Sequence, residues 1–556
     1  MVGFPSVTGT DGELEFAPFL RDLLGQHPYF QAHPEHLWLG RTKTDPFERY
    51  VLYALVKGSG SQTVILTGHY DVVSVANYGP LAELAFDPEK LLPALIRELR
   101  ESGRGEVDML ALSDLESGNF LPGRAALDMK SGLAAGLAVL ERFAEDPARE
   151  GNLLFVAVPD EEEASHGMRT AAADLLGVAA RWGLEFKAAI NLDASVDSGS
   201  GEEGQAVFTG SVGKLLPSVL LLGRPTHAGA PFDGVNANLL AAELTRLMEV
   251  NPDLGDPGDD PAHQQRAEPH QQRAEPHQQR AELAPPPISL YQSDLRAHYD
   301  VTTPASAWCA FNLLTHCRSP KEVLGMMVGT VEQAIAKALE LMQERARVYA
   351  ERSGFPARVP AYQPKVLTFA GLKRLAFQKP GVRARYDELS QHLAQDSSLD
   401  LVTLSRKLIE FLVHQAALEG PAAVVGFASL YYPKAELGDG VGARALLETV
   451  QEALTEVSQE TGCEVSLRRF FPGISDISFL AGRDDTEALQ RLTDNTPAWG
   501  VRLEFDYSLA SRLNLPTLNI GPWGRDYHQR TERVHMPYSF GVLPELLWRV
   551  VRKAMS

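Results

Sequence analysis

The sequence has few cysteines and no paired cysteine motif. Its 556 residues include three cysteines, Cys309, Cys317 and Cys463, and no two of them form a Cys-x-x-Cys pair. Such a small, odd number argues against a disulfide framework and is normal for a protein of the reducing cytoplasm. We therefore expect the three cysteines to be buried small apolar side chains rather than metal ligands.

Long apolar segments and an excess of basic residues are also missing. No run of about 18 uninterrupted apolar residues occurs, and the first residues show no basic start followed by an apolar stretch. The 72 acidic and 52 basic residues give a net charge of −20. This balance disfavours a nucleic acid or an anionic membrane as the main partner. The charge balance says little about a small substrate, whose binding depends on local charge. We expect a soluble, cytoplasmic protein.

The length and the pattern of apolar runs predict more than one domain. Short apolar runs at 62–69, 152–159 and 187–193 alternate with helix-type segments such as 130–143. Strands that alternate with helices predict an α/β domain with a mostly parallel central sheet and flanking helices. In such sheets, sites form at the carboxyl ends of the strands.

The middle of the chain differs in character from its two ends. We expect a smaller α+β domain at 211–375, a lid or dimerisation domain, which interrupts a catalytic domain formed by 1–210 and 376–556. A low-complexity insertion is predicted at 255–287, where the motif His-Gln-Gln-Arg-Ala-Glu starts at His263 and is repeated from His270 and His277. The repeat has no apolar pair and contains proline, so it is neither a coiled coil nor a solenoid. We expect a disordered or loosely helical surface insertion rather than a metal site.

Two of the candidate functional segments contain polar residues beside a predicted strand or helix. His69 and Asp71 stand two apart at the end of a predicted strand. An aspartate that accepts a hydrogen bond from a metal-bound imidazole fixes its tautomer, although a loop histidine capped by an aspartate would look the same. Asp128 precedes a predicted helix. It is either a helix cap or a carboxylate that bridges two cations.

The acidic pair Glu161-Glu162 is more specific because it follows a buried strand. Adjacent residues that leave a strand point in different directions, so one carboxylate can bind a metal while the other faces the water to be activated. Two neighbouring carboxylates near cations can also have different proton affinities, as general-base chemistry requires. The alternative is a solvated acidic turn. Asp193 ends a further apolar run, and His528 follows a loop that contains glycine.

Together these segments resemble a family of zinc peptidases. The family includes carboxypeptidase G, aminoacylase-1, acetylornithine deacetylase and succinyl-diaminopimelate desuccinylase. The resemblance is carried by Gly68–Asp71, Gly123–Lys130, Pro159–Glu162, Asn191–Asp193 and Gly521–His528. The residue sequences of 68–73, 470–476 and 521–528 are most similar to the arginine-utilisation protein RocB branch of this family.

The resemblance implies a co-catalytic site with two Zn²⁺ ions, and Mn²⁺ or Co²⁺ would suit the same ligand types. Asp128 matches the aspartate that bridges the two ions, Glu161 the general base, and Asp71 the carboxylate that orients the first histidine. The implied metal ligands are His69, Asp128, Glu162, Asp193 and His528.

The resemblance also implies a role for the middle domain. His227 matches a histidine that, in family dimers, reaches the active site of the partner subunit and steadies the oxyanion. Asn236, a few residues on, is expected to bind substrate, and a homodimer is implied. The arginine that holds a substrate carboxylate has no counterpart in the strand at 308–314, and Arg318 lies beyond it.

The sequence thus predicts a metal-dependent hydrolase of the aminoacylase, deacetylase or peptidase type. Its substrate would be an N-acyl amino acid or a small peptide, with a link to arginine or ornithine catabolism. The alternative is a catalytically inactive, metal-binding family member that acts as a regulatory or scaffold protein in amino-acid degradation. The presence of Glu161 argues against that alternative, because a purely structural metal site needs no base.

Overall fold

The computed structural model describes residues 1–103, 105–196, 204–256, 284–296, 298–396, 398–471, 473–482 and 485–555. Most of the predicted insertion at 255–287, including the repeat that starts at His263, lies outside these residues. The chain forms two compact units, which we call the first unit (Met1–Ser211, Lys434–Arg483 and Asp506–Ser556) and the second unit (Val212–Pro433 and Asp484–Phe505).

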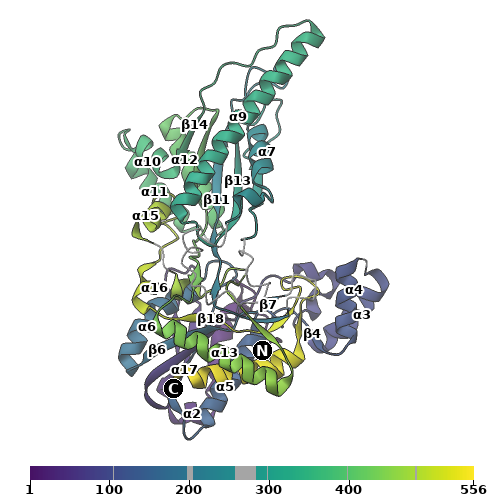
Figure 1. Ribbon diagram of the computed structural model, residues 1–556. Coiled ribbons are helices and arrows are strands. Elements are labelled where there is room, and N and C mark those ends of the chain that lie inside the picture. Colours follow the sequence, from purple (N-terminus) through teal and green to yellow (C-terminus); the bar gives the residue numbers. More distant parts are fainter. Residues whose placement is uncertain are drawn as a thin grey trace, which may run out of the picture. The chain divides into compact units, whose positions relative to one another are not determined.

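The first unit is built around a sheet whose described strands follow the order β1-β2-β5-β3-β6-β18-β8-β17; β6 and β18 are labelled in Figure 1. The neighbours β5, β3, β6 and β18 run parallel to one another, while β1 and β2 are antiparallel at one edge. This confirms the predicted α/β fold with a mostly parallel sheet. In sheet order the strands are Leu37–Arg41, Tyr50–Lys57, Glu150–Val158, Ser59–His69, Glu185–Asn191, Thr517–Asn519, Gln205–Phe208 and Val465–Arg468.

Amphipathic helices cover this sheet. α5 and α17 pack against β3, and α6 packs against β2 and β5. The buried faces of α5 and α17 carry leucine, valine, alanine and phenylalanine side chains that form one core with the strands. The helices are α1 (Asp11–Leu24), α2 (Pro28–Ala32), α3 (Pro88–Ser102), α4 (Glu106–Glu116), α5 (Lys130–Glu145), α6 (His166–Trp182), α13 (Val441–Thr461), α14 (Ser478–Ala481), α16 (Ser508–Leu513) and α17 (Leu543–Met555).

Two small sheets in the first unit join segments that are far apart in sequence. β9 (Gly210–Ser211) pairs with β16 (Ala435–Glu436). The other sheet has the order β4-β20-β19-β7, with strands Phe120–Pro122, Arg533–His535, Trp523–Arg525 and Ser195–Val196. It therefore holds a segment near residue 530 against segments near residues 121 and 195.

The second unit has its own sheet, in the order β10-β13-β11-β15-β14, with β12 paired to β13. These strands are Gly213–Leu215, Ser306–Thr315, Pro217–Leu222, Ala422–Phe427, Lys365–Thr368 and Ile288–Asp294. The long helix α9 begins at a capping box formed by Ser319 and Glu322. The helices are α7 (Ala237–Met248), α9 (Pro320–Ser353), α10 (Phe369–Phe377), α11 (Val382–Ala394), α12 (Leu401–Ala416) and α15 (Thr486–Asp494).

The second unit extends further along the chain than the predicted domain at 211–375. β15 pairs with β11 across its whole length, and β14 runs parallel to β15. The chain up to residue 433 therefore belongs to the second unit. The segment 484–505 also joins the second unit. The predicted return at residue 376 therefore differs from the observed division, because strand pairing with β11 keeps the later segment in the second unit.

Two further expectations concern single features. Cys309 is buried as expected, whereas Cys317 is exposed and Cys463 is partly exposed, so the prediction of three buried cysteines was wrong for two of them. Among the described residues, none of the helices combines the length and the apolar character that a membrane span requires.

Candidate metal centre

Three neighbouring strands of the first unit end at the same edge of the sheet. His69 is the last residue of β3, Glu161 and Glu162 follow the end of β5, and Asp193 follows the end of β6. The registers of β3 with β5 and of β3 with β6 place these strand ends side by side. Because the strands are parallel, their carboxyl ends meet at one edge, as the sequence predicts.

Asp128 reaches this edge because α5 packs unusually close to the loop after β6. A Cβ atom added at Gly132 would lie 2.0 Å from the main-chain oxygen of Leu192, and one at Gly136 would lie 2.5 Å from Cδ1 of Leu192. Because the atom that faces Gly132 is main chain, only glycine fits at that position, whereas at Gly136 the neighbour is the end of a side chain. The residue two places before α5, Asp128, is thereby held beside Asp193.

His528 reaches the same edge from the loop between β19 and β20. This hairpin pairs with β4, which leads to Asp128, and with β7, which follows Asp193. The loop of the hairpin thus lies between two segments that already carry candidate ligands. The long-range pairing in the small sheet is what adds His528 to the cluster.

The carboxylate of Asp128 lies between two histidines. Its Oδ1 atom lies 3.0 Å from Nε2 of His69, and its Oδ2 atom lies 3.3 Å from Nε2 of His528. Glu162 Oε1 lies 3.0 Å from the same nitrogen of His528, and Asp193 Oδ1 lies 3.9 Å from Nε2 of His69. The donor atoms therefore form two groups that share Asp128, one with His69 and Asp193 and one with Glu162 and His528.

Asp71 organises the neighbouring turn. Its two carboxylate oxygens accept hydrogen bonds from the main-chain N–H groups of Glu161 and Glu162, at 3.0 and 3.2 Å. Nδ1 of His69 lies 3.0 Å from the main-chain oxygen of Asp71 and 3.6 Å from its carboxylate. If Nδ1 donates to that carbonyl oxygen, Nε2 is left as the atom that faces Asp128, which is the arrangement of a metal-bound imidazole.

The side chains of Glu161 and Glu162 diverge, as predicted for consecutive residues after a strand. Glu162 contacts His528, whereas Oε2 of Glu161 lies 3.9 Å from Nε2 of His69. Burial raises the pKa of Glu161 well above its usual range; His69 acts to lower it, while Asp476 and Asp193 raise it further. Glu161 is therefore a strongly basic carboxylate inside the cluster.

The cluster holds more negative charge than its own histidines can neutralise. Burial raises the pKa of Asp193 to about 8, and Asp128 acts in the same direction. Burial acts to lower the pKa of His528, but contacts with Asp128 and Glu162 raise it to about 11. Cations bound to such a set of carboxylates and imidazoles would displace these protons.

The donor set fits two divalent metal ions. Oδ1 of Asp128 is buried and lies 3.0 Å from Nε2 of His69, but among the described residues it accepts no well-aligned hydrogen bond, as suits an oxygen that shares a cation with that imidazole. Carboxylate oxygens and imidazole nitrogens suit Zn²⁺, Mn²⁺ and Co²⁺. The residues that could hold the ions are those predicted from the sequence: His69, Asp128, Glu162, Asp193 and His528.

A buried ion pair that the sequence analysis did not predict connects two loops of the cluster. Arg124 pairs with Glu532, and both side chains are buried. Oε1 of Glu532 accepts hydrogen bonds from the main-chain N–H groups of Leu127 and Asp128, at 3.3 and 3.5 Å. Nη2 of Arg124 donates to the main-chain oxygen of His528 at 3.4 Å. The pair thus ties the loop of Asp128 to the loop of His528.

A second missed residue is Asp476, which precedes α14. It is 1 % exposed, and within the part of the chain that the structure describes neither of its carboxylate oxygens has a hydrogen-bond partner. Burial raises its pKa to about 7; His69 acts to lower it, and Asp71 and Asp160 raise it. The sequence analysis used the segment 470–476 only as part of the family resemblance, because nothing in the local sequence shows that Asp476 is buried near the cluster.

His227 and Asn236 belong to the second unit and are not part of the cluster in the first unit. His227 is exposed, and its Nδ1 accepts a hydrogen bond from the main-chain N–H of Gly229 at 3.0 Å. Asn236 caps α7, since its side chain accepts from the main-chain N–H of Asn238 at 2.9 Å. Its observed contact is therefore structural.

Comparison with known proteins identifies relatives over the whole chain. The model of peptidase family M20/M25/M40 matches residues 104–490. The uncharacterized protein YqjN of Bacillus subtilis (strain 168) is 32% identical over 553 residues, which cover 98% of this chain and 93% of YqjN. Protein RocB of the same organism is 30% identical over 552 residues, which cover 98% of this chain and 92% of RocB. A solved structure, the M20 family metallo-carboxypeptidase Sso-CP2 of Sulfolobus solfataricus, is 12% identical, with a TM-score of 0.49 and coverage of 100% of this chain and 98% of that chain.

Proposed function

Because the chain belongs to peptidase family M20/M25/M40, whose members are metallopeptidases, we propose that it is a two-metal amidohydrolase. Its substrate would be an N-acyl amino acid or a small peptide. The observation that carries this proposal is the position of Asp128, whose two oxygens face a different histidine each. A single shared carboxylate between two sets of ligands is the arrangement that a co-catalytic pair of ions requires.

In this proposal His69, Asp128 and Asp193 would hold one ion, and Asp128, Glu162 and His528 would hold the other. When bound, two such ions lower the pKa of a water molecule and polarise the scissile carbonyl. Glu161 takes the proton of the water and passes it to the leaving amine. Asp71 fixes the turn that carries Glu161, so that the base and the ligand Glu162 keep their separate directions.

The metal identity and the substrate are finer parts of the proposal. Zn²⁺ is our first choice, and Mn²⁺ or Co²⁺ suit the same donors. This chain is similar to protein RocB, and the resemblance to the RocB branch suggests a link to arginine or ornithine catabolism. This supports a first screen of N-acyl arginine and N-acyl ornithine. The cytoplasm is the proposed location.

A homodimer is the proposed assembly, with His227 of each subunit acting on the oxyanion in the active site of the other. The exposed side chain of His227 supports this role, whereas the cap formed by Asn236 leaves only part of that side chain for substrate. Mixing His227→Ala and Glu161→Gln protomers should restore activity through hybrid dimers. Failure to recover activity after confirmed subunit exchange would exclude the shared site.

The metal content tests the shared carboxylate. Elemental analysis of protein purified without chelator should give about two metal ions per chain, and Asp128→Ala should lose most of both. Asp22→Ala, which removes an exposed aspartate of α1, should keep the wild-type content. If Asp128→Ala keeps both ions, Asp128 is not the bridge.

The base is tested separately from the metal. Glu161→Gln should keep its metal ions and lose hydrolysis by at least about a hundredfold, since general-base catalysis contributes roughly 10²–10⁴-fold. The exposed neighbour Glu163 provides the control variant Glu163→Gln. A wild-type protein that binds metal but hydrolyses no N-acyl amino acid or peptide would favour the scaffold alternative.

A further inference from the structure

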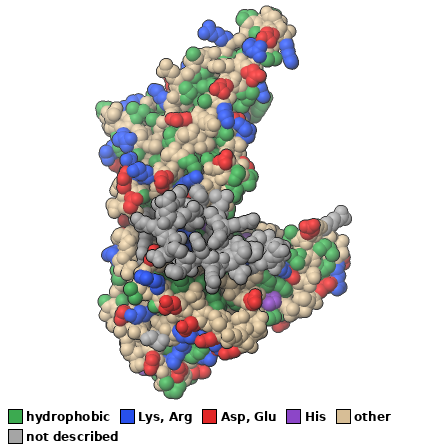
Figure 2. All heavy atoms as spheres, viewed as in Figure 1, with side chains coloured by type: hydrophobic (Ala, Val, Ile, Leu, Met, Phe, Trp, Pro, Cys, Tyr) green, Lys and Arg blue, Asp and Glu red, His purple; other side chains and the backbone are tan. Residues whose placement is uncertain are grey.

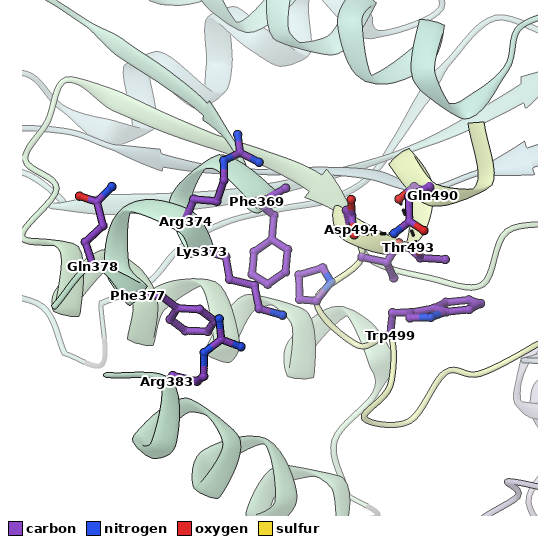
Figure 3. Close-up of a pocket in the computed structure, with 13 residues that line it drawn as sticks. Phe369, Lys373, Arg374, Phe377, Gln378, Arg383, Gln490, Thr493, Asp494 and Trp499 are labelled. Atoms are coloured by element: carbon purple, nitrogen blue, oxygen red, sulfur yellow. Dashed lines mark hydrogen bonds between the residues drawn. The ribbon is translucent and has the colours of Figure 1, made fainter. Parts of the chain in front are cut away.

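The second unit contains a cavity whose lining residues include none of the predicted metal ligands. It has a volume of about 870 Å³ and lies between α10, the start of α11 and the segment 490–499 (Figure 3). This volume is within the range of cavities that bind small molecules, roughly 300–1,000 Å³. Nothing in the proposed hydrolytic mechanism uses it.

The cavity is rich in positive charge. Lys373, Arg374 and Arg383 line it, and none of them forms an ion pair with a carboxylate of the described residues. Burial and the neighbouring Arg383 lower the pKa of Lys373, whereas Asp387 and Asp494 act in the opposite direction. On the face seen in Figure 2, Lys and Arg side chains gather where α10 and α11 lie in Figure 1.

Aromatic rings position two of these cations. Nζ of Lys373 lies 5.7 Å from the ring centre of Phe377 and 5.2 Å from that of Tyr386. The guanidinium of Arg383 lies 4.6 Å from the ring centre of Phe377. A ring face attracts a cation but leaves its N–H groups without acceptors. The two cations are therefore held in place with donors available for an anion.

The remaining walls suit a flat apolar group. Phe369 and Trp499 both line the cavity and stand apart from one another, with the side chain of Lys373 next to Phe369 (Figure 3). The acidic side chain at the rim, Asp494, is partly engaged, because Gln490 donates to its carboxylate at 2.8 Å. Aromatic walls beside cations favour a ligand that has a planar ring and a strongly anionic group.

We propose that this cavity binds a mononucleotide-like ligand, in which a phosphate meets Lys373 and Arg383 and a planar ring lies against the aromatic walls near Trp499. Guanidinium groups bind phosphate through paired N–H donors, and an ammonium adds a point charge. The site is separate from the metal cluster in its residues, so the proposal holds whether or not the proposed hydrolysis is correct.

The test is calorimetric titration of the full-length, metal-loaded protein with AMP, inorganic phosphate and adenosine. AMP should bind, and phosphate or adenosine alone should bind at least about tenfold more weakly. The double variant Lys373→Gln/Arg383→Gln should weaken AMP binding by at least about tenfold, because hydrogen bonds to charged groups are among the stronger ones.

The control variant Lys379→Gln/Arg385→Gln removes the same charge from the same region without touching the cavity lining, and it should bind AMP as the wild type does. Metal content should not change on AMP addition. No AMP binding at millimolar concentration, or equal binding by wild type and the Lys373→Gln/Arg383→Gln variant, would overturn the proposal. Phosphate that binds as tightly as AMP would overturn the role of the ring.

Discussion

Replacing Glu532 by glutamine should damage both the stability of the protein and its hold on metal. Glu532 is 0 % exposed and Arg124 is 1 % exposed, so the substitution leaves a buried guanidinium without its counter-charge. The same carboxylate accepts the main-chain N–H groups of Leu127 and Asp128. Arg124 in turn donates to the main-chain oxygen of His528. One substitution therefore acts on both loops that carry the shared ligand and its partner.

The expected magnitude follows from this burial. Removing one partner of a buried ion pair costs about 3–5 kcal/mol. In a domain of roughly 150–250 residues, 1 kcal/mol lowers the unfolding midpoint by about 2–4 °C, and the first unit is larger, so we expect a fall of about 5–10 °C. Burial raises the pKa of Glu532 to about 7, although Arg124 acts to lower it, so the measurement belongs at pH 8, where the carboxylate is charged. Metal affinity should fall about 10–100-fold, as it does when groups that support metal ligands are removed.

The assay compares the single variant with the double variant Arg124→Met/Glu532→Met. Thermal unfolding followed by circular dichroism gives the midpoint, and competition with a chromophoric chelator gives the metal affinity. The double variant removes both charges and should regain most of the lost midpoint, because apolar side chains of similar volume replace buried ion pairs at little cost. Its metal affinity should stay low, because methionine, unlike glutamine, gives the N–H groups of Leu127 and Asp128 no oxygen acceptor.

The control is Glu351→Gln in the exposed ion pair with Arg347 on α9, which should change the midpoint very little. The reasoning is refuted if Glu532→Gln lowers the midpoint by no more than this control does. It is also refuted if the double variant binds metal as tightly as the wild type, because the pair would then not position the ligands.

Two further predictions concern the approach of α5 and the charge of the cluster. Gly132→Ala places a Cβ 2.0 Å from the main-chain oxygen of Leu192, so it should lower the free energy of unfolding by about 1–3 kcal/mol and reduce metal content. Gly177→Ala in α6, where no atom lies within 4 Å of the added Cβ, should be neutral or stabilising. Equal unfolding midpoints for the two variants would contradict the close approach of α5. The chelated protein should lose stability as the pH rises from about 5 to 8, because the folded chain holds protons on Asp193 (pKa about 8) and Asp476 (pKa about 7) that the unfolded chain has released above about pH 4. Bound metal should flatten this pH dependence, and Asp476→Asn should weaken it. The measurement is a series of thermal unfolding scans of the chelated protein. An unfolding midpoint that rises from about pH 5 to 8 would contradict the prediction.

The sequence was sufficient where local pattern and sheet geometry agree. His69, Glu161 and Asp193 each follow an apolar run, and parallel strands bring such ends together, so their proximity could be predicted. The partnership of Arg124 with Glu532 could not, since a buried charge has no local sign of the distant charge that neutralises it. The predicted extent of the second unit differs from the observed one for the same reason. The apolar run at 422–427 indicates a strand, but it does not indicate that this strand pairs with β11.

The order in which the chain leaves the ribosome bears on when the metal cluster can form. His69, Asp128 and Asp193 are all made early, before the second unit exists. His528 is made near the end, together with β18, which lies in the interior of the sheet of the first unit. Domains generally fold as units during synthesis, but here a nascent chain has only one of the two ligand groups until its last segment emerges. In the proposed two-metal site, a chain that stops before His528 therefore lacks one of the two metal positions, and the proposed hydrolysis requires this last segment.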